Sequence, residues 1–167
     1  MPTNYYLFFL TALIPLIVGA VYYHDKVFGS AWKKVNGFSD EDLAGANMLV
    51  IFGSTYFLGV LLSVAASSFA IHQPAVFQMM MPEVMVSGSA AEQQFLDLMK
   101  NFGEHHRSFS HGAIHGGIMA VFFALPLLAI NALFERRGWK YVFIHLGYWF
   151  ICLILIGGIL CETLIYL

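Results

Sequence analysis

The chain has 167 residues, of which 59% are hydrophobic and 11% charged, and its net charge is −2 with neutral histidines. Soluble domains carry about 25% charged residues, and one of this size still exposes about a third of the surface of its unfolded chain. A chain this apolar is therefore expected in a membrane, and the absence of a basic surplus excludes nucleic acid as a partner.

Four segments are apolar enough to cross a membrane, because a spanning helix needs roughly 20 mostly apolar residues. We predict an all-α membrane protein, a four-transmembrane-helix bundle that forms a single membrane domain over residues 1–167. The predicted spans are residues 5–22, 47–69, 112–134 and 141–164, and a long outer loop covers residues 70–110. No basic residue precedes the first span and no typical cleavage site follows it, so we expect it to be retained rather than removed as a signal peptide.

Basic residues predict the orientation, since Lys and Arg are enriched in cytoplasmic loops. The loops after the first and third spans hold six of them: Lys26, Lys33, Lys34, Arg136, Arg137 and Lys140. The 70–110 loop holds only Lys100 and Arg107. We therefore expect this loop and both termini on the outer side of the membrane.

The outer loop contains one amphipathic helix. Ser89 and Glu92 form the S-x-x-E pattern that is typical of a helix start, and Gly103 is a plausible stop. Between them, four apolar residues recur at helical spacing: Phe95, Leu98, Met99 and Phe102. This pattern predicts a helix that lies on the outer membrane surface or caps the bundle.

A stripe of small residues follows the third span at every fourth position, at Gly112, Gly116, Ala120 and Ala124. Small residues at this spacing let two helix backbones approach closely in a membrane, where no hydrophobic drive brings helices together. The stripe predicts close packing of this span against a neighbour.

Titratable side chains gather where the third span begins, in the segment "EHHRSFSHGAIHGG" at residues 104–117. His111 and His115 are four residues apart, so a helix places them on one face. Antiparallel threading brings His72, after the second span, and Glu162, near the end of the fourth, to the same level. The surface loop adds four nearby residues: Glu104, His105, His106 and Arg107.

Three interpretations of this cluster stay open. The histidines can serve structure alone, through hydrogen bonds across helices and to water. They can hold a transition metal or haem, with His111 and His115 as the metal ligands, since neutral imidazole is a common ligand. They can also belong to a proton or ion path, with Glu162 paired to His111 or His115.

Four stretches together resemble one family: "VYYHDKVFGSAWKKVNGFS", "HHRSFSHGAIHGG", "LPLLAINALFERRGWKY" and "GYWFICLILIGGILC". In content and order they are similar to the DUF1761 family of small bacterial membrane proteins, to which no biochemical activity is assigned. The resemblance implies a bacterial inner-membrane protein, so the outer side that both termini are expected to face is the periplasmic side. The resemblance implies that the following residues belong to family motifs: Phe28, Gly29, Trp32, Arg107, Phe109, His111, Gly112, Phe134, Glu135 and Arg136.

No Ser/His/Asp triad, nucleophilic cysteine motif or phosphate-binding glycine loop is present, which favours a non-enzymatic role. We expect an integral membrane protein of unknown role, acting as an accessory or interaction subunit. The alternatives are a His/Glu metal- or haem-binding protein at the outer leaflet and an oligomeric small transporter or channel. Four spans leave little room inside one chain, so we expect the lipid bilayer and either a homo-oligomer or another membrane protein as partners.

Overall fold

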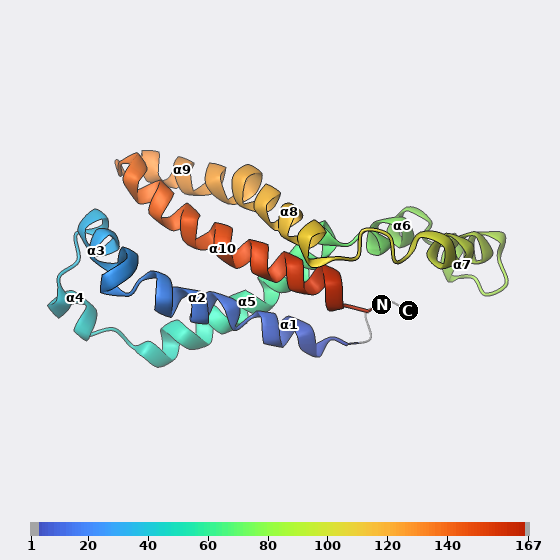
Figure 1. Cartoon of the computed structure of the whole chain (residues 1–167), viewed down its shortest axis with the longest axis horizontal. Helices are drawn as coiled ribbons and strands as arrows, with labels where there is room; N and C mark the ends of the chain where they lie inside the picture. Colours follow the sequence, from blue (N-terminus) through green and yellow to red (C-terminus); the bar gives the residue numbers. More distant parts are fainter. Residues whose placement is uncertain (1–3, 166–167) are drawn as a thin grey trace.

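The computed structural model describes residues 4–165, which are helical and contain no β-strand. Three stretches are long and apolar enough to cross a membrane: α5 (Met48–Ala70), the combined span Phe109–Phe134, and α10 (Trp139–Thr163). A fourth is added if Tyr6–Tyr22 and the next helical segment, Asp25–Asn36, which meet at a bend of 60°, are taken together as one span. The prediction of an all-α fold with four membrane crossings is confirmed, and the first crossing is the least regular (Figure 1).

The first crossing is divided into α1 (Tyr6–Thr11) and α2 (Ile14–Tyr22). Pro15, in the first turn of α2, lacks a backbone N–H and cannot continue the hydrogen-bond pattern of α1. The buried hydroxyl groups of Thr11 and Ser63 are hydrogen-bonded at 2.9 Å, which links α1 to α5. Such contacts between helices contribute about 0.6 kcal/mol each in a membrane protein.

The end of the bundle opposite the outer loop is built from short segments. The π-helix η1 (Asp25–Gly29) leads into α3 (Ser30–Asn36), and α4 (Asp40–Ala44) follows. Ser39 Oγ accepts a hydrogen bond from the Asp42 N–H, and the Asp42 carboxylate accepts one from the Ser39 N–H. These contacts with Ser39 hold the pKa of Asp42 below its ordinary value. The chain is thus turned sharply before α5 begins.

The third crossing consists of α8 (Phe109–Met119), the π-helix η3 (Ala120–Ala124) and α9 (Leu125–Phe134). The wide π turn lies directly before Pro126, which sits in the first turn of α9 and has no N–H to donate. The proline is therefore accommodated without ending the span.

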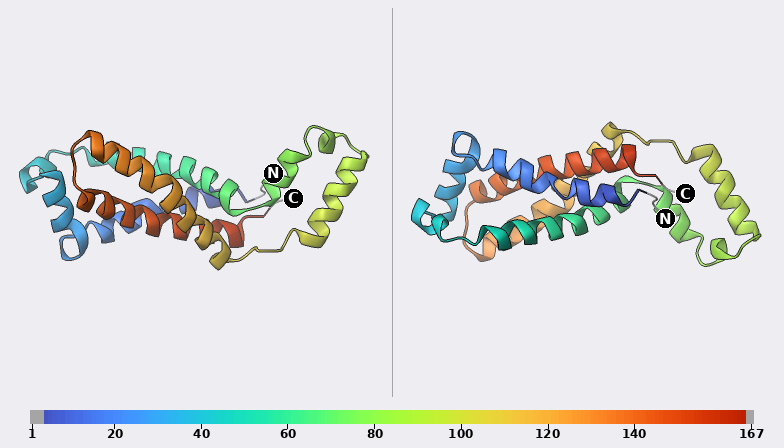
Figure 2. Two further views of the ribbon diagram at one scale, coloured as in Figure 1. Left: turned by 90° about the horizontal axis from the view of Figure 1, so that it is seen from above. Right: turned by 90° about the horizontal axis from the view of Figure 1, so that it is seen from below.

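α8 and α10 run side by side in all three views (Figures 1 and 2). A Cβ atom on Gly112 or Gly157 would overlap the facing backbone, and one on Gly116 would overlap the Leu153 carbonyl oxygen. Gly112, Gly116 and Ala120 are buried, so the predicted stripe of small residues does form a helix contact. This close approach sets the position of α8, and with it the position of its histidines.

The outer loop forms α6 (Gln73–Met79), the 3-10 helix η2 (Glu83–Met85) and α7 (Ala90–Phe102). α6 and α7 extend beyond the end of the bundle (Figures 1 and 2). The predicted cap of α7 is present, since Ser89 Oγ accepts from the Glu92 N–H at 3.0 Å. Asn4 and Thr163 are hydrogen-bonded at 2.9 Å, so the first and last parts of the described chain lie together.

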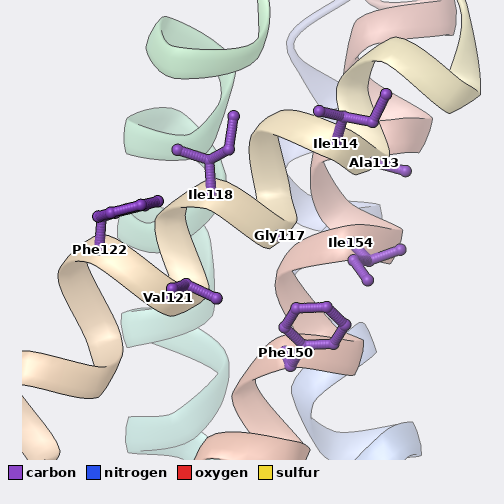
Figure 3. Close-up of a pocket in the computed structure, with 8 residues that line it drawn as sticks. All are labelled: Ala113, Ile114, Gly117, Ile118, Val121, Phe122, Phe150 and Ile154. Carbon is purple, nitrogen blue, oxygen red and sulfur yellow. The ribbon is translucent and has the colours of Figure 1, made fainter.

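Large apolar side chains cover the outside of the bundle. Leu49, Phe122 and Phe134 are 84%, 76% and 88% exposed. Figure 3 shows a shallow hollow on this surface between α8, η3 and α10, and all eight residues that line it are apolar or glycine. A soluble monomer rarely exposes so much contiguous apolar surface, so this surface suits contact with lipid.

Candidate metal centre

Three histidines meet at the outer-loop end of the bundle. His111 lies in the first turn of α8, where its N–H donates to the capping Ser108 Oγ at 3.3 Å, and His115 follows one turn later. His72 comes from the other side of the bundle, two residues after α5 ends at Ala70. Ile71 between them has an extended backbone, which turns the chain out of α5. The structure thus brings one ring nitrogen from each of these three residues close together.

The imidazole rings are close enough to share one ion. The Nε2 atoms of His72 and His111 are 3.1 Å apart. The ring centre of His115 lies 4.6 Å from that of His111 and 5.5 Å from that of His72. One ring nitrogen from each histidine lies within 4.8 Å of the other two. Two ligands of a tetrahedral zinc ion at 2.0–2.1 Å are separated by about 3.3 Å, so small side-chain movements would complete a three-histidine site.

The surroundings also fit neutral imidazole. His72 is exposed and His111 and His115 are partly exposed, so the site is accessible from the outer end. A 3.1 Å approach of two Nε2 atoms requires one ring to donate an N–H to a neutral acceptor ring, or a cation between two lone pairs. Two imidazolium rings at this distance would repel each other.

Of the two predicted carboxylates, neither joins the three histidines. Glu162 lies in the last turn of α10 and is exposed. Within residues 4–165, its side chain makes no hydrogen bond or ion pair, so the expected pairing with His111 or His115 is not seen. Glu104 is likewise exposed and lies outside the group of convergent ligand atoms.

The loop from Gly103 to Arg107 is anchored beside the histidines. The Arg107 guanidinium donates to the Leu164 carbonyl oxygen and, at 3.3 Å, to Gln73 Oε1. The Gln73 amide donates to the Gly103 carbonyl oxygen. Arg107 was expected near the cluster, and its observed role is to join this loop to α6 and to the end of α10.

Cys161 adds a second anchor that the sequence did not indicate. Its thiol lies within hydrogen-bonding distance of the Ala70 carbonyl, at 3.3 Å, and of the His106 carbonyl, at 3.4 Å. The thiol is therefore in contact with both the end of α5 and the loop before α8. Cys152, the other cysteine, is also buried and free.

A cavity of about 340 Å³ adjoins the three histidines between α6 and the end of α7. Of the three histidines only His72 lines it, together with His105 and His106. The remaining lining comes from Gln73, Gly103 and the apolar side chains of α6 and α7. The His105 ring leans on Phe102 with its centre 5.4 Å away, whereas the His106 ring stacks on His111 at 5.1 Å.

The model of the family DUF1761, described as a protein of unknown function, matches residues 7–161. The chain belongs to the DUF1761 family. Neither a curated protein nor a solved structure matches it. His72, His111 and His115 all lie in the matched region of this DUF1761 protein, and Glu162 lies one residue outside it.

Several motif residues of this DUF1761 chain have a structural part at the other end of the bundle. Phe28 stacks on Tyr22 with ring centres 4.5 Å apart, and Trp32 lies 5.4 Å from the Tyr23 ring. A Cβ on Gly29 would overlap the Tyr23 carbonyl oxygen, so this tight π turn requires glycine. These residues lie at the bend after the first crossing, at the end of the bundle opposite the three histidines.

The remaining motif residues lie at the two ends of the third crossing. Phe109 packs against Gly158 of α10, where a Cβ would come within 2.6 Å of its ring. At the other end, Glu135 pairs with Arg137 at 3.2 Å, and Arg136 has a left-handed backbone with φ of 56°. The Phe134 side chain is exposed on the outside of the bundle. Of the ligand atoms that converge in the described residues 4–165, none comes from these four motif residues.

Proposed function

We propose that this protein binds a divalent transition-metal ion at the outer end of its membrane bundle, through His72, His111 and His115. The observation that carries the proposal is the convergence of one ring nitrogen from each residue to within 4.8 Å of the others. Imidazole nitrogen is a common ligand of Zn²⁺, Cu²⁺, Ni²⁺ and Fe²⁺. Three protein ligands leave a fourth position open for water or a further donor.

The arrangement supports a single ion better than haem. Haem iron takes its axial ligands from opposite faces of a flat macrocycle, so two axial nitrogens at 2.0 Å each would be about 4 Å apart with the ring between them. The Nε2 atoms of His72 and His111 are only 3.1 Å apart and face each other directly. No macrocycle fits between them, whereas one small cation does.

The proposal places the metal centre on the periplasmic side of a bacterial inner membrane. Six of the eight basic residues lie in segments at the opposite end of the bundle, and basic residues favour the cytoplasmic side. Lys33 at that end binds Asp25 and Asp40 at 2.8 and 2.9 Å, which raises its pKa and holds its charge there. Action as an accessory subunit, with a second copy or another membrane protein, stays a prediction that cross-linking in native membranes tests.

Metal titration of the detergent-purified protein tests this proposal. After removal of bound ions with a chelator, Zn²⁺ or Co²⁺ should bind at one ion per chain. The double substitution His111→Ala/His115→Ala removes two ligands and should weaken binding at least ~100-fold, since loss of even an outer-shell contact costs 10–100-fold. His24→Asn, at the far end of the bundle, is the matched control and should bind as the unaltered protein does.

Two results would contradict the proposal. One is the absence of stoichiometric binding by the folded, unaltered chain. The other is unchanged affinity in the double variant, which would place any bound ion elsewhere.

A further inference from the structure

We infer that His106 is an exchangeable fourth ligand of the metal centre, so that the site alternates between a closed four-histidine state and an open three-histidine state. This inference rests on the proposed metal site of His72, His111 and His115 and adds to it. It concerns the loop before α8, which no family description assigns to any activity.

The His106 ring lies beside the rings of His111 and His72. The His106 imidazole stacks on His111 with centres 5.1 Å apart and planes at 29°, and it lies 6.5 Å from the His72 ring. Its nitrogens are outside the convergent group of three. This residue is exposed, so rotation about its side-chain bonds can bring a ring nitrogen closer to the three histidines.

The backbone at His106 has an uncommon conformation. His106 has φ of 61°, in the left-handed region that residues other than glycine seldom adopt. Such a conformation persists when its surroundings hold it, and it occurs at functional sites. Here the Cys161 thiol contacts the His106 carbonyl oxygen. The next residue, Arg107, donates a hydrogen bond to the Leu164 carbonyl oxygen at the end of α10. The backbone of the loop is thus held, while the exposed His106 side chain contacts neighbouring rings and can change its rotamer.

A cavity lies beside His106. The cavity of about 340 Å³ is lined by His72, His105 and His106, so it adjoins the trio on the side of His106. It gives the His106 ring a place to go when it leaves the metal. With the ring in the cavity, the fourth position is open to water or to an exchanging ligand, as in zinc sites with three protein ligands.

Co²⁺ is the probe for the test, because its visible bands respond to the kind of ligand as well as to the number of ligands. The variant His106→Asn removes the imidazole, and asparagine tolerates the left-handed backbone. We expect it to retain one Co²⁺ per chain, to shift its visible bands because water replaces an imidazole nitrogen at the fourth position, and to release Co²⁺ to a chelator at least 10-fold faster. His105→Asn, the neighbouring exposed histidine, is the matched control and should behave as the unaltered protein.

The outcomes separate this inference from the proposed function. If His106→Asn keeps the unaltered spectrum and release rate, the fourth-ligand assignment is overturned while the three-histidine site stands. Equal effects of His105→Asn and His106→Asn also overturn it, because they would report a general loop disturbance. His106→Gly suits the same backbone and must reproduce His106→Asn. Failure of the unaltered protein to bind Co²⁺ would instead overturn the proposed function.

Discussion

His72 links the candidate site to the packing of the bundle, because it alone brings a ligand from the end of α5 to the two histidines of α8. Its position depends on one extended residue, Ile71, whose side chain is fully buried in the core. Two half-exposed histidines on a helix face are unremarkable by themselves. A third imidazole at 3.1 Å makes the group a potential chelate.

The pH dependence of metal affinity tests whether these histidines are the ligands. Imidazole binds a metal ion only in its neutral form, and histidine ordinarily titrates near pH 6.5. Protons therefore compete with the metal, and we expect Zn²⁺ affinity to be full above about pH 7 and to fall steeply as pH drops below about 6. Isothermal titration of the purified protein at pH 7.5 and pH 5.5 measures this. Equal affinities at the two values would point to carboxylate ligands such as Glu162 in place of the histidines.

Among the helices, the contact between α8 and α10 matters most for the site. It determines how far α8 lies from the rest of the bundle and how α8 is rotated about its own axis, and so it determines where His111 and His115 point. Gly112, Gly116 and Gly157 allow the two backbones to touch. A larger side chain at any of them would push α8 outward and separate its histidines from His72.

Substitution of neighbouring glycines tests this contact. A Cβ at Gly116 would overlap the Leu153 backbone, whereas one at Gly117 would meet only the Phe150 ring at 3.6 Å. We expect Gly116→Ala to lower the free energy of unfolding in detergent by about 1–3 kcal/mol through overpacking. Gly117→Ala should be neutral or slightly stabilising, since alanine is the better helix former. Similar losses in both variants would show that the α8–α10 contact is not as close as described.

For the whole molecule, the two ends differ in chemistry. The outer-loop end carries the three convergent histidines, and the opposite end carries most of the basic residues. The first and last described residues lie at the histidine end, as an even number of crossings requires.

Labelling in intact cells tests the orientation. Ser87→Cys introduces an exposed thiol in the outer loop, and Lys34→Cys introduces one at the opposite end. The two native cysteines are buried and should react little. A membrane-impermeant maleimide should label Ser87→Cys in intact cells and Lys34→Cys only after lysis, because basic loops stay cytoplasmic. The reverse pattern would put the metal centre in the cytoplasm.

Local patterns in the sequence predicted the class of the fold and part of the site. Hydrophobic runs of bilayer length predicted the crossings, the S-x-x-E pattern predicted the start of α7, and the spacing of His111 and His115 placed them on one helix face. These features depend on a few neighbouring residues, so periodicity and capping chemistry are sufficient to predict them.

Only the tertiary structure decided which groups complete the site. The order of the crossings predicted that His72 and Glu162 lie at the same level of the membrane. Which side chain faces the interior of the bundle, however, depends on the rotation of each helix about its own axis. That rotation follows from backbone contact at Gly112, Gly116 and Gly157, so it directs the α8 histidines toward His72 while Glu162 remains exposed. The anchors from Gln73 and Cys161 likewise join segments far apart in the chain, and no local pattern reports such contacts.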